Sequence, residues 1–509
     1  MKKAESIAGA ALAVSLLVIL GKLLGFGREA LIASYYGATA ETDAFFFAQG
    51  MPGTIFPAVC NSISTAFVSL YVKRMTEEGE GPGDRYASRM LLCTTLLGVA
   101  LGLLGAALSP VLVPLFAPGF SGAQLTLAVY LTRLTMGAFV LTMLQYMLSA
   151  VLNSKKLFVG SQVAGLLYNT AIIAVTALLG RGQNMTVLTL TVILGMLVQV
   201  AALLLCCRGH FTYTHGLTPF HSDTRRLLRM ALPILLGNSV VQLNHIVDKA
   251  LGSMLPEGSL SALSYANSLT TMVVSVFILS LSTVLYPTLT TDAAKGDMDR
   301  FGETLLQSTG VLSLLLIPIS CITLLDAQDI VAAVYARGSF DQTAVSYTAV
   351  ALACYAPMFF FSGIREVFSR AFFALQDTKT PMRNGAIGVG CNIVFSLVFV
   401  RWLGLAGIAL GTTLSIAVIA GLLLRSAHTH LPSLRLRRFF TSVGKQLLAG
   451  AVLAAVLLMF RRAVSIPWPL LRFAADTAVG FLVYLLALLP LRCRELQSMM
   501  DLLRQKLRR

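Results

Sequence analysis

Long apolar runs, separated by short polar or Gly/Pro-containing segments, follow one another along all 509 residues of this chain. A helix needs about 20 apolar residues to cross a hydrocarbon core of roughly 30 Å, and each run is of that order. The pattern predicts fourteen membrane spans, at residues 7–36, 43–72, 90–117, 122–152, 157–180, 184–207, 228–254, 259–289, 301–325, 342–375, 382–402, 404–424, 446–460 and 468–491. The predicted fold class is therefore an all-α polytopic membrane protein.

Lysine and arginine are distributed unevenly between the two sides that these spans define. If the N-terminus is cytoplasmic, the even-numbered connections and both termini hold 27 of the 39 Lys and Arg residues, and the odd-numbered connections hold five. The other seven lie deeper within spans; Arg229, Arg383 and Arg401, each one position inside a span end, are counted with the adjoining connection. Because cytoplasmic loops of membrane proteins carry such an excess, we expect both termini in the cytoplasm.

A weak internal repeat indicates how the spans are grouped. Residues 152–156, 165–169 and 178–180 recur about 223 residues later as 375–379, 388–392 and 402–404. Six helices are an even number, so both copies point the same way, related by an axis along the membrane normal. Chance similarity among apolar segments is the alternative. The predicted domains are an N-lobe at 1–217, a C-lobe at 218–430, helices 13 and 14 at 431–491, and a basic amphipathic cytoplasmic tail at 492–509.

Composition agrees with a membrane protein and narrows the function. The chain is 56% hydrophobic and only 12% charged, which excludes a water-soluble enzyme. Its eight cysteines are scattered without a CxxC pair, and we interpret them as small hydrophobic residues. No connection is long enough for a catalytic domain, so we expect a transporter and not an enzyme.

Charges inside the spans point to the ligand. Each must find a partner, a watery cavity or the interface, because a charge in hydrocarbon is costly. The residues are Lys22, Arg28, Arg133, Lys249, Arg365, Arg370 and Arg472, against Glu29, Asp248, Glu366 and Asp476. Glu366 and Arg370, and likewise Arg472 and Asp476, have the spacing of an ion pair within one helix. The surplus of positive charge favours a phosphate-bearing substrate, whereas an antiporter of organic cations would need surplus carboxylates.

The first span carries the most suggestive pattern. Gly21 and Gly25 form a stripe of small residues that lets another helix approach closely, and Arg28 continues this stripe. Lys22 and Glu29 share a neighbouring face, about 10 Å apart along the axis. We expect a helix whose charged edge borders a cavity; the alternative is a buried structural ion network.

Further polar groups predict an ion site and bends. Asp248, Asn392, Ser396 and Thr412 are oxygen-bearing residues at membrane depth, and such oxygens suit a monovalent cation such as sodium. Lys249 beside Asp248 offers a simpler explanation for the carboxylate. Two proline-containing spans, the second and the tenth, are where we expect helices to bend, at Pro52, Pro57, Pro357 and Gly363.

Several motifs resemble the MurJ (MviN) family, the lipid II flippases of the multidrug/oligosaccharidyl-lipid/polysaccharide exporter superfamily. They are residues 21–29 (GKLLGFGRE), 36–37, 42–46 (TDAFF), 231–237 (ALPILLG), 264–267 (SYAN) and 365–381. The resemblance implies two six-helix lobes around a central cationic cavity, with helices 13 and 14 forming a groove for the polyprenyl tail. It also implies outward movement of undecaprenyl-diphosphate-linked peptidoglycan precursor (lipid II) across the bacterial cytoplasmic membrane by alternating access. Membrane potential or sodium is the implied drive.

The resemblance also assigns residues. Arg28 matches an arginine of the family cavity, Lys22 stands where an arginine is common, and Asp43 matches an acidic residue after helix 1. Asp248, Asn392 and Thr412 match the family's proposed sodium positions, with Ser396 where a carboxylate can occur. The predicted substrate-binding residues are Arg28, Lys22, Glu29, Asp43, Arg365, Lys249 and Arg133.

This chain departs from the family pattern at two places. The region of Phe56 has no basic residue where many members have an arginine, and Ser268 stands where helix 8 often has one. Either Lys249, Arg133 or Arg365 takes over part of the diphosphate contact, or the substrate is another polyprenyl-linked glycan. A multidrug cation antiporter is the remaining alternative. We expect lipid II and membrane lipids as partners, cell-wall synthesis proteins as candidate partners, a monomer, no nucleic acid, and no cofactor apart from the candidate sodium ion.

Overall fold

The computed structural model describes residues 2–215, 218, 221–431, 434, 436–464, 466–491, 493 and 495–497. Most of the basic tail predicted at 492–509 lies outside these residues. Throughout the described part the secondary structure is helical, with no strand. By their contacts the residues form two compact units, Met1–Ser261 and Ala262–Arg509.

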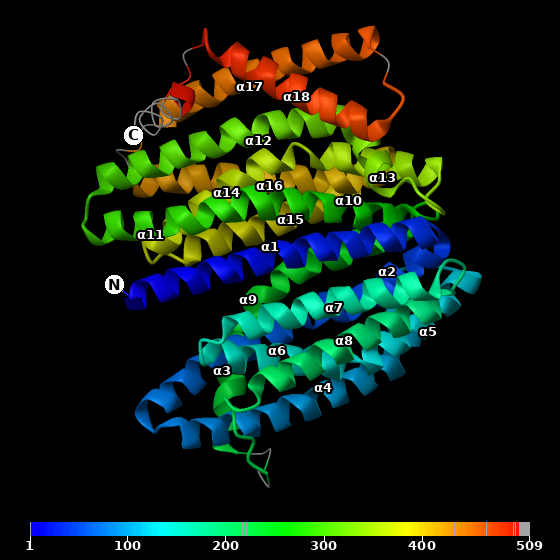
Figure 1. The fold of residues 1–509 in the computed structure, drawn as a ribbon, viewed down its shortest axis with the longest axis vertical. Helices are drawn as coiled ribbons and strands as arrows, with labels where there is room; N and C mark the ends of the chain where they lie inside the picture. Colours follow the sequence, from blue (N-terminus) through cyan, green and yellow to red (C-terminus); the bar gives the residue numbers. More distant parts are fainter. Residues whose placement is uncertain are drawn as a thin grey trace. The chain divides into compact units, whose positions relative to one another are not determined.

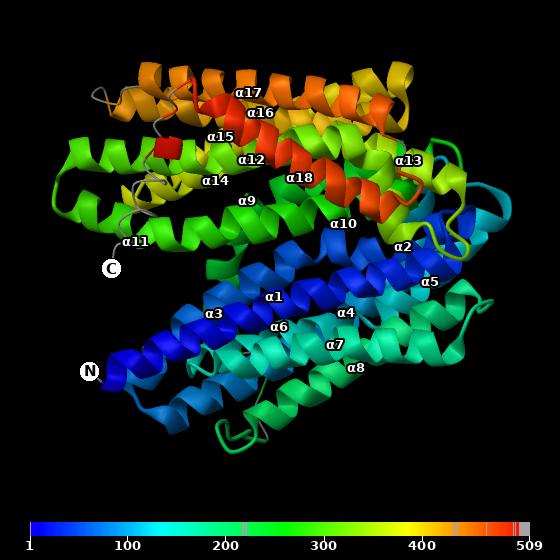
Figure 2. The same ribbon diagram turned by 45° about the horizontal axis from the view of Figure 1, so that its top comes forward.

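Nine helices precede the junction between the units. They are α1 (Lys2–Tyr36), α2 (Ala40–Ile55), α3 (Pro57–Glu77), α4 (Glu80–Phe116), α5 (Gly122–Gly137), α6 (Phe139–Ser154), α7 (Phe158–Leu179), α8 (Met185–Cys207) and α9 (Ser222–Ser253). In both views α7 lies beside α8, and α1 packs along α7 (Figures 1 and 2). Packing groups α9 with this first unit, although the repeat assigns its residues to the predicted C-lobe. The lobe boundaries remain a prediction about the repeat.

The second unit contains the remaining helices. They are α10 (Ser259–Val273), which begins at the junction, the π-helix η1 (Val274–Leu279), α11 (Ser280–Ala294), α12 (Met298–Tyr335), α13 (Gln342–Tyr355), α14 (Met358–Ala374), α15 (Lys379–Leu403), α16 (Leu405–His430), α17 (Leu436–Ala463) and α18 (Pro469–Leu488). Helices α12, α17 and α18 pack against one another (Figure 1). The buried core of the unit includes Phe301, Phe359 and Phe368.

Each predicted span coincides with one helix or with one broken helix. Ten described helices are long and apolar enough to cross a membrane, or eleven if the bent pair α13 and α14 forms one span. The chain is thus a multi-pass membrane protein, while the count of fourteen spans stays a prediction.

The broken helices follow the six-helix period of the repeat. The second and fourth predicted spans break at Phe56 and Ala138, and the eighth and tenth break at the π-helix 274–279 and at 356–357. Pro57 and Pro357 stand at two of these breaks, as expected for residues that lack a backbone N–H. The α13–α14 bend is 44°. Pro52 and Gly363 lie inside helices α2 and α14 and start no break.

Connections at repeat-equivalent places share their backbone geometry. Lys156 after α6 and Gln376 after α14 both have positive φ, at 63° and 61°. Gly180 after α7 and Gly404 after α15 do as well, at 73° and 55°. Gly180 and Gly404 are aligned positions of the repeat, whereas Lys156 and Gln376 share only their place two residues after a helix end.

Candidate functional site

The stripe of small residues on α1 faces α7. A Cβ atom on Gly21 would lie 3.6 Å from the side chain of Leu166, and one on Gly25 would lie 3.8 Å from that of Asn169. These are ordinary contact distances, so the glycines allow α1 to lie close to α7 without steric conflict. The sequence predicted the stripe, and the structure identifies the helix that it meets.

Arg28 lies one turn further along the same face. Its Nη1 donates a hydrogen bond to Oδ1 of Asn169 at 3.2 Å, and its Nη2 donates to Oε1 of Glu29 at 2.7 Å. The guanidinium also lies over the ring of Tyr168, 5.5 Å from the centroid. Its Nε has no hydrogen-bond partner among the described residues. Because a guanidinium has more N–H donors than these two bonds use, Arg28 retains donors for a ligand.

Burial at this place is intermediate, and the charge is partly compensated. The side chains of Arg28 and Glu29 are 17% and 16% exposed. Glu29 thus pairs with its neighbour Arg28, while Lys22 is exposed and forms no ion pair within the part of the chain that the structure describes. One cation of this helix is therefore paired and another is exposed, and the cavity beside its charged edge stays a prediction.

Lys249 approaches α2 from α9. Its side chain occupies the space that Gly50 leaves empty, so that a Cβ on Gly50 would collide with Nζ and Cε. The ammonium group therefore depends on a glycine in the facing helix. Asp248 and Lys249 both take part in polar interactions.

Asp43 holds the start of α10. Its Oδ2 accepts a hydrogen bond from the backbone N–H of Gly258 at 2.7 Å, and its Oδ1 accepts one from the N–H of Ser261 at 2.7 Å. The Ser261 hydroxyl donates to the same carboxylate. Only 3% of Asp43 is exposed. Asp43 thus has a structural role at the start of α10, and its part in substrate binding stays a prediction.

The remaining predicted cations are dispersed. Arg133 is exposed on α5 and donates from Nε to the Ser109 hydroxyl at 3.2 Å. Arg365 is half-buried on α14 in the second unit, beside the Glu366–Arg370 ion pair at 2.8 Å, which confirms that predicted pair. None of the described contacts joins Lys22 or Arg133 to Arg28.

The predicted pair between Arg472 and Asp476 is wrong. Asp476 on α18 accepts a hydrogen bond from Nε of Arg461 on α17 at 2.9 Å. Arg472 instead lies 3.6 Å from Asp329 on α12. Asp476 and Arg472 pair with residues of other helices because α12, α17 and α18 meet here. Sequence spacing indicates only contacts within one helix.

Three of the four predicted sodium-site residues lie together between α15 and α16. The Nδ2 of Asn392 donates to the Thr412 hydroxyl at 3.1 Å and to the Ser415 hydroxyl at 3.4 Å, and Ser396 donates to Oδ1 of Asn392 at 3.4 Å. Asn392 and Ser396 are buried. Gly411 makes this approach possible, because a Cβ there would lie 2.7 Å from the Ser396 hydroxyl. Asp248 belongs to α9 in the first unit.

The sequence reasoning missed Asn169, Tyr168 and Ser415. The repeat carried a signal for one of them, since Asn169 and Asn392 are the last residues of the matched segments 165–169 and 388–392. On α7 this asparagine meets an arginine, and on α15 it meets hydroxyl groups.

The family-like segment 365–381 includes the start of a helix. Asp377 precedes α15 and its Oδ1 accepts from the backbone N–H groups of Lys379 and Thr380, each at 3.0 Å. Hydrogen bonds from the Thr380 side chain and backbone hold the pKa of Asp377 below its ordinary value. The motif therefore has a structural explanation that does not need substrate.

The chain is similar to proteins of one family along most of its length. A family model described as lipid II flippase MurJ matches residues 32–478. The chain belongs to the MurJ family. The lipid II flippase MurJ of Burkholderia cenocepacia is 29% identical over 478 residues, which is 90% of each chain. The probable lipid II flippase MurJ of Treponema pallidum is 25% identical, over 80% of this chain and 79% of the relative.

Solved structures show that the fold is shared with MurJ and beyond it. A lipid II flippase MurJ in an inward closed conformation has a TM-score of 0.81 at 23% identity, over 94% of this chain and 98% of the other. An inward-facing multidrug resistance transporter of the MATE family has a TM-score of 0.71 at 14% identity, over 84% and 99%. At these identities the likeness concerns the fold alone. MurJ membership itself rests on the family match.

Proposed function

We propose that this chain is a lipid II flippase. It moves the undecaprenyl-diphosphate-linked peptidoglycan precursor from the inner to the outer leaflet of the bacterial cytoplasmic membrane by alternating access, with both termini cytoplasmic. Family membership over residues 32–478 supports the substrate class. The observation from this molecule that carries the proposal is Arg28, an arginine of the predicted first span with an unused hydrogen-bond donor.

Arg28 suits the diphosphate group of such a lipid. A guanidinium stays charged at any depth and presents parallel donors to phosphate oxygens. Asn169 and Glu29 hold two of its nitrogens, so its orientation is set before a ligand arrives. The diphosphate would contact Nε and compete with Glu29 for Nη2. Lys22 adds an exposed positive charge about 9 Å away along the helix axis. Arg365 of α14 stays a predicted substrate-binding residue.

Coupling to sodium is a second part of the proposal. Asn392, Ser396 and Thr412 bring an amide oxygen and two hydroxyl oxygens together, and Ser415 adds a third hydroxyl. Neutral oxygens of this kind fit a weakly held monovalent cation better than a divalent ion, which favours carboxylates. Asp248, the carboxylate predicted for this ion, belongs to the first unit and stays a prediction. Flipping that is independent of a sodium gradient and unchanged in Asn392→Ala would contradict this part.

The central experiment measures lipid II on both leaflets in a bacterium whose own flippase is depleted. Expression of this chain should prevent accumulation of lipid II in the inner leaflet. Arg28→Ala should abolish this rescue. Arg370→Gln is a matched control, because Arg370 is also a half-buried arginine paired with one carboxylate, and it should retain rescue. Accumulation despite normal membrane expression of the unchanged chain would contradict the function.

A double variant separates a ligand from a structural ion pair. Arg28→Ala leaves Glu29 without its cation, whereas Arg28→Ala combined with Glu29→Gln removes both charges of the pair. If Arg28 served only to neutralise Glu29, the double variant would regain activity. We expect it to regain membrane stability and to remain inactive.

One observation keeps a second substrate in view. Where many family members have an arginine, Phe56 packs against Phe139 with ring centroids 4.4 Å apart, so this place is apolar in the present chain. Export of another polyprenyl-linked glycan is therefore the second candidate. This second candidate would be favoured if the chain rescued a strain that lacks the flippase for a different lipid-linked glycan but failed to lower lipid II in the inner leaflet. The surplus of basic residues within the predicted spans continues to count against a multidrug cation antiporter.

A further inference from the structure

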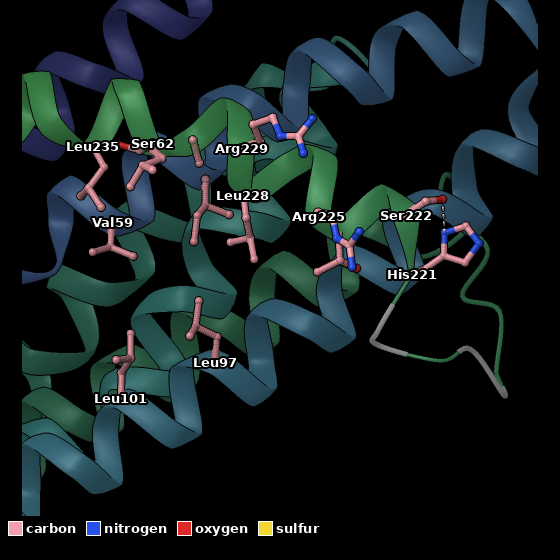
Figure 3. Close-up of a pocket in the computed structure, with 14 residues that line it drawn as sticks. Val59, Ser62, Leu97, Leu101, His221, Ser222, Arg225, Leu228, Arg229 and Leu235 are labelled. Atoms are coloured by element: carbon pink, nitrogen blue, oxygen red, sulfur yellow. Dashed lines mark hydrogen bonds between the residues drawn. The ribbon is translucent and has the colours of Figure 1, made fainter.

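A groove of about 910 Å³ lies between α3, α4 and α9 in the first unit (Figure 3). The α9 wall runs from His221 to Leu235, which corresponds to about 21 Å of helix. Most of the remaining wall is apolar. The other lining residues are Val59, Ser62, Ile63, Leu97, Leu101, Ser222, Thr224, Arg225, Leu228, Arg229, Ala231 and Leu232.

The groove is amphipathic from end to end. Arg225 and Arg229 stand one helical turn apart near the His221 end, and both are exposed. The structure gives neither of them an ion pair among the described residues, and no carboxylate is found among the lining residues. Further along α9, Leu235 belongs to the apolar wall that also includes Leu97 and Leu101 of α4 (Figure 3).

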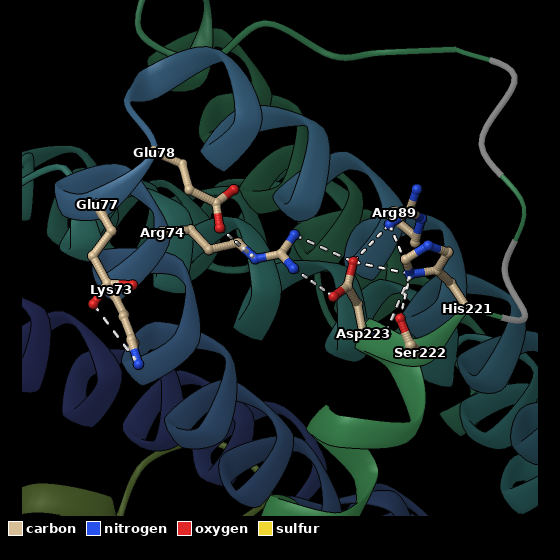
Figure 4. Close-up of polar contacts among 8 residues, drawn as sticks. All are labelled: Lys73, Arg74, Glu77, Glu78, Arg89, His221, Ser222 and Asp223. Carbon is tan, nitrogen blue, oxygen red and sulfur yellow. Dashed lines mark hydrogen bonds and ion pairs between the residues drawn. The ribbon is translucent and has the colours of Figure 1, made fainter.

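Asp223, a carboxylate two residues before Arg225, is already engaged by other side chains. It accepts from Nη2 of Arg74 on α3 at 2.6 Å and from Nη1 of Arg89 on α4 at 2.7 Å, and His221 lies 3.0 Å away (Figure 4). Asp223 is 6% exposed. This cluster fastens the first turn of α9 to both neighbouring helices. It shapes the mouth of the groove and leaves the charges of Arg225 and Arg229 uncompensated.

We propose that this groove binds one bilayer phospholipid with an anionic headgroup. The phosphate contacts Arg225 and Arg229, and an acyl chain lies along Leu97, Leu101 and Leu235. Charge complementarity supports this occupant, since two guanidinium groups without a carboxylate favour a phosphate. Length agrees too, because one leaflet with its headgroup region is about 20–22 Å deep. In the predicted orientation the mouth faces the cytoplasmic leaflet, where anionic lipids attract basic side chains.

The test uses the full chain, purified in mild detergent and offered phosphatidylglycerol or phosphatidylcholine with identical acyl chains. Native mass spectrometry reads the bound lipid. We expect phosphatidylglycerol to be retained preferentially, and Arg225→Gln with Arg229→Gln to weaken its retention roughly 20–30-fold. Arg437→Gln with Arg438→Gln is the matched control, because it removes two exposed arginines of α17 outside the groove. This control should retain the lipid.

A third variant tests the apolar part. Leu101→Gln places a polar amide on the groove wall and should weaken retention of both phospholipids. Thermal unfolding of each variant shows whether it is folded; because both arginines are exposed, their glutamine variants should unfold as the unchanged chain does. Equal loss in the groove and α17 variants would overturn the proposal, and so would equal retention of the two headgroups. Full displacement of phosphatidylglycerol by undecaprenyl diphosphate would assign the groove to the substrate tail instead.

Discussion

Arg28 in the first unit and Arg461 in the second are comparably buried arginines with different surroundings. Their side chains are 17% and 23% exposed. Arg28 has one carboxylate and one amide as partners, and its Nε has none in the described residues. Arg461 is surrounded by the carboxylates of Asp326, Asp329 and Asp476 and also donates to a backbone carbonyl.

This difference separates two uses of a buried cation. A guanidinium whose donors are occupied by the protein contributes to packing, as Arg461 does by joining α17 to α12 and α18. A guanidinium with spare donors can bind a ligand without first breaking the fold. Burial alone does not distinguish the two, whereas the number of occupied donors does.

The largest effect is expected at Arg461, the arginine whose donors are occupied by the protein. Arg461→Ala leaves Asp326 and Asp476 without a cation, although they are 0% and 1% exposed. Removing one partner of a buried ion cluster costs about 3–5 kcal/mol, so we expect a large fall in the thermal unfolding temperature. Arg461→Lys should restore part of the loss. An unfolding temperature within experimental error of the unchanged chain would show that the cluster does not stabilise the second unit.

A somewhat smaller effect is expected at Asp43, whose carboxylate oxygens are occupied by donors of the protein. Asp43→Ala leaves the buried N–H groups of Gly258 and Ser261 without their acceptor, which costs roughly 2–3 kcal/mol. Loss of stability measured by thermal unfolding should accompany any loss of transport. A stable Asp43→Ala chain that cannot flip lipid would instead return Asp43 to the substrate site.

The open arginine should affect transport more than stability. We expect Arg28→Ala to lower the rate of lipid II flipping at least about tenfold, equivalent to roughly 1.4 kcal/mol, in reconstituted vesicles. Arg28→Lys should be intermediate, since an ammonium keeps the charge and loses the planar fork of donors. Wild-type flipping by Arg28→Ala would place Arg28 in the same structural class as Arg461.

The smallest effect is expected at Arg472, which lies at the edge of the cluster formed by Arg461 and its aspartates. Arg472 is 35% exposed and lies 3.6 Å from Asp329, so its ion pair is largely solvated. Arg472→Ala should cost at most about 1 kcal/mol in thermal unfolding. A loss as large as that of Arg461→Ala would mean that the aspartates need both arginines. The number of neighbouring charges, and not the number of occupied donors, would then distinguish Arg461 from Arg28.

Prediction from the sequence succeeded where the interaction is local. Each apolar run became a helix or a broken helix, and Glu366 pairs with Arg370 one turn away. Breaks at Pro57 and Pro357 were predictable because proline lacks a donor. The break at Ala138, which follows Gly137, and the π-helix at 274–279 carry no proline, and the apolar pattern predicted neither.

The candidate site shows the limit of such reasoning. Arg28 and its glycine stripe were evident in the sequence, but Asn169 and Tyr168 come from a helix 141 and 140 residues away. Asp43 had the sequence features of a ligand residue, and its donors at 258–261 became apparent only after folding. Spacing cannot report such partners, because they depend on which helix faces meet.

The amino-acid sequence by itself determined the solvent, the helices and the sign of the surplus charge, because hydrophobicity and net charge are sums over residues. Tertiary structure decided which charges are used up by the protein. Arg461 and Asp43 are occupied by neighbours, whereas Arg28 keeps an unused donor. The reason is geometric: a hydrogen bond acts over about 3 Å, so only the packed arrangement of helices determines which donors meet an acceptor.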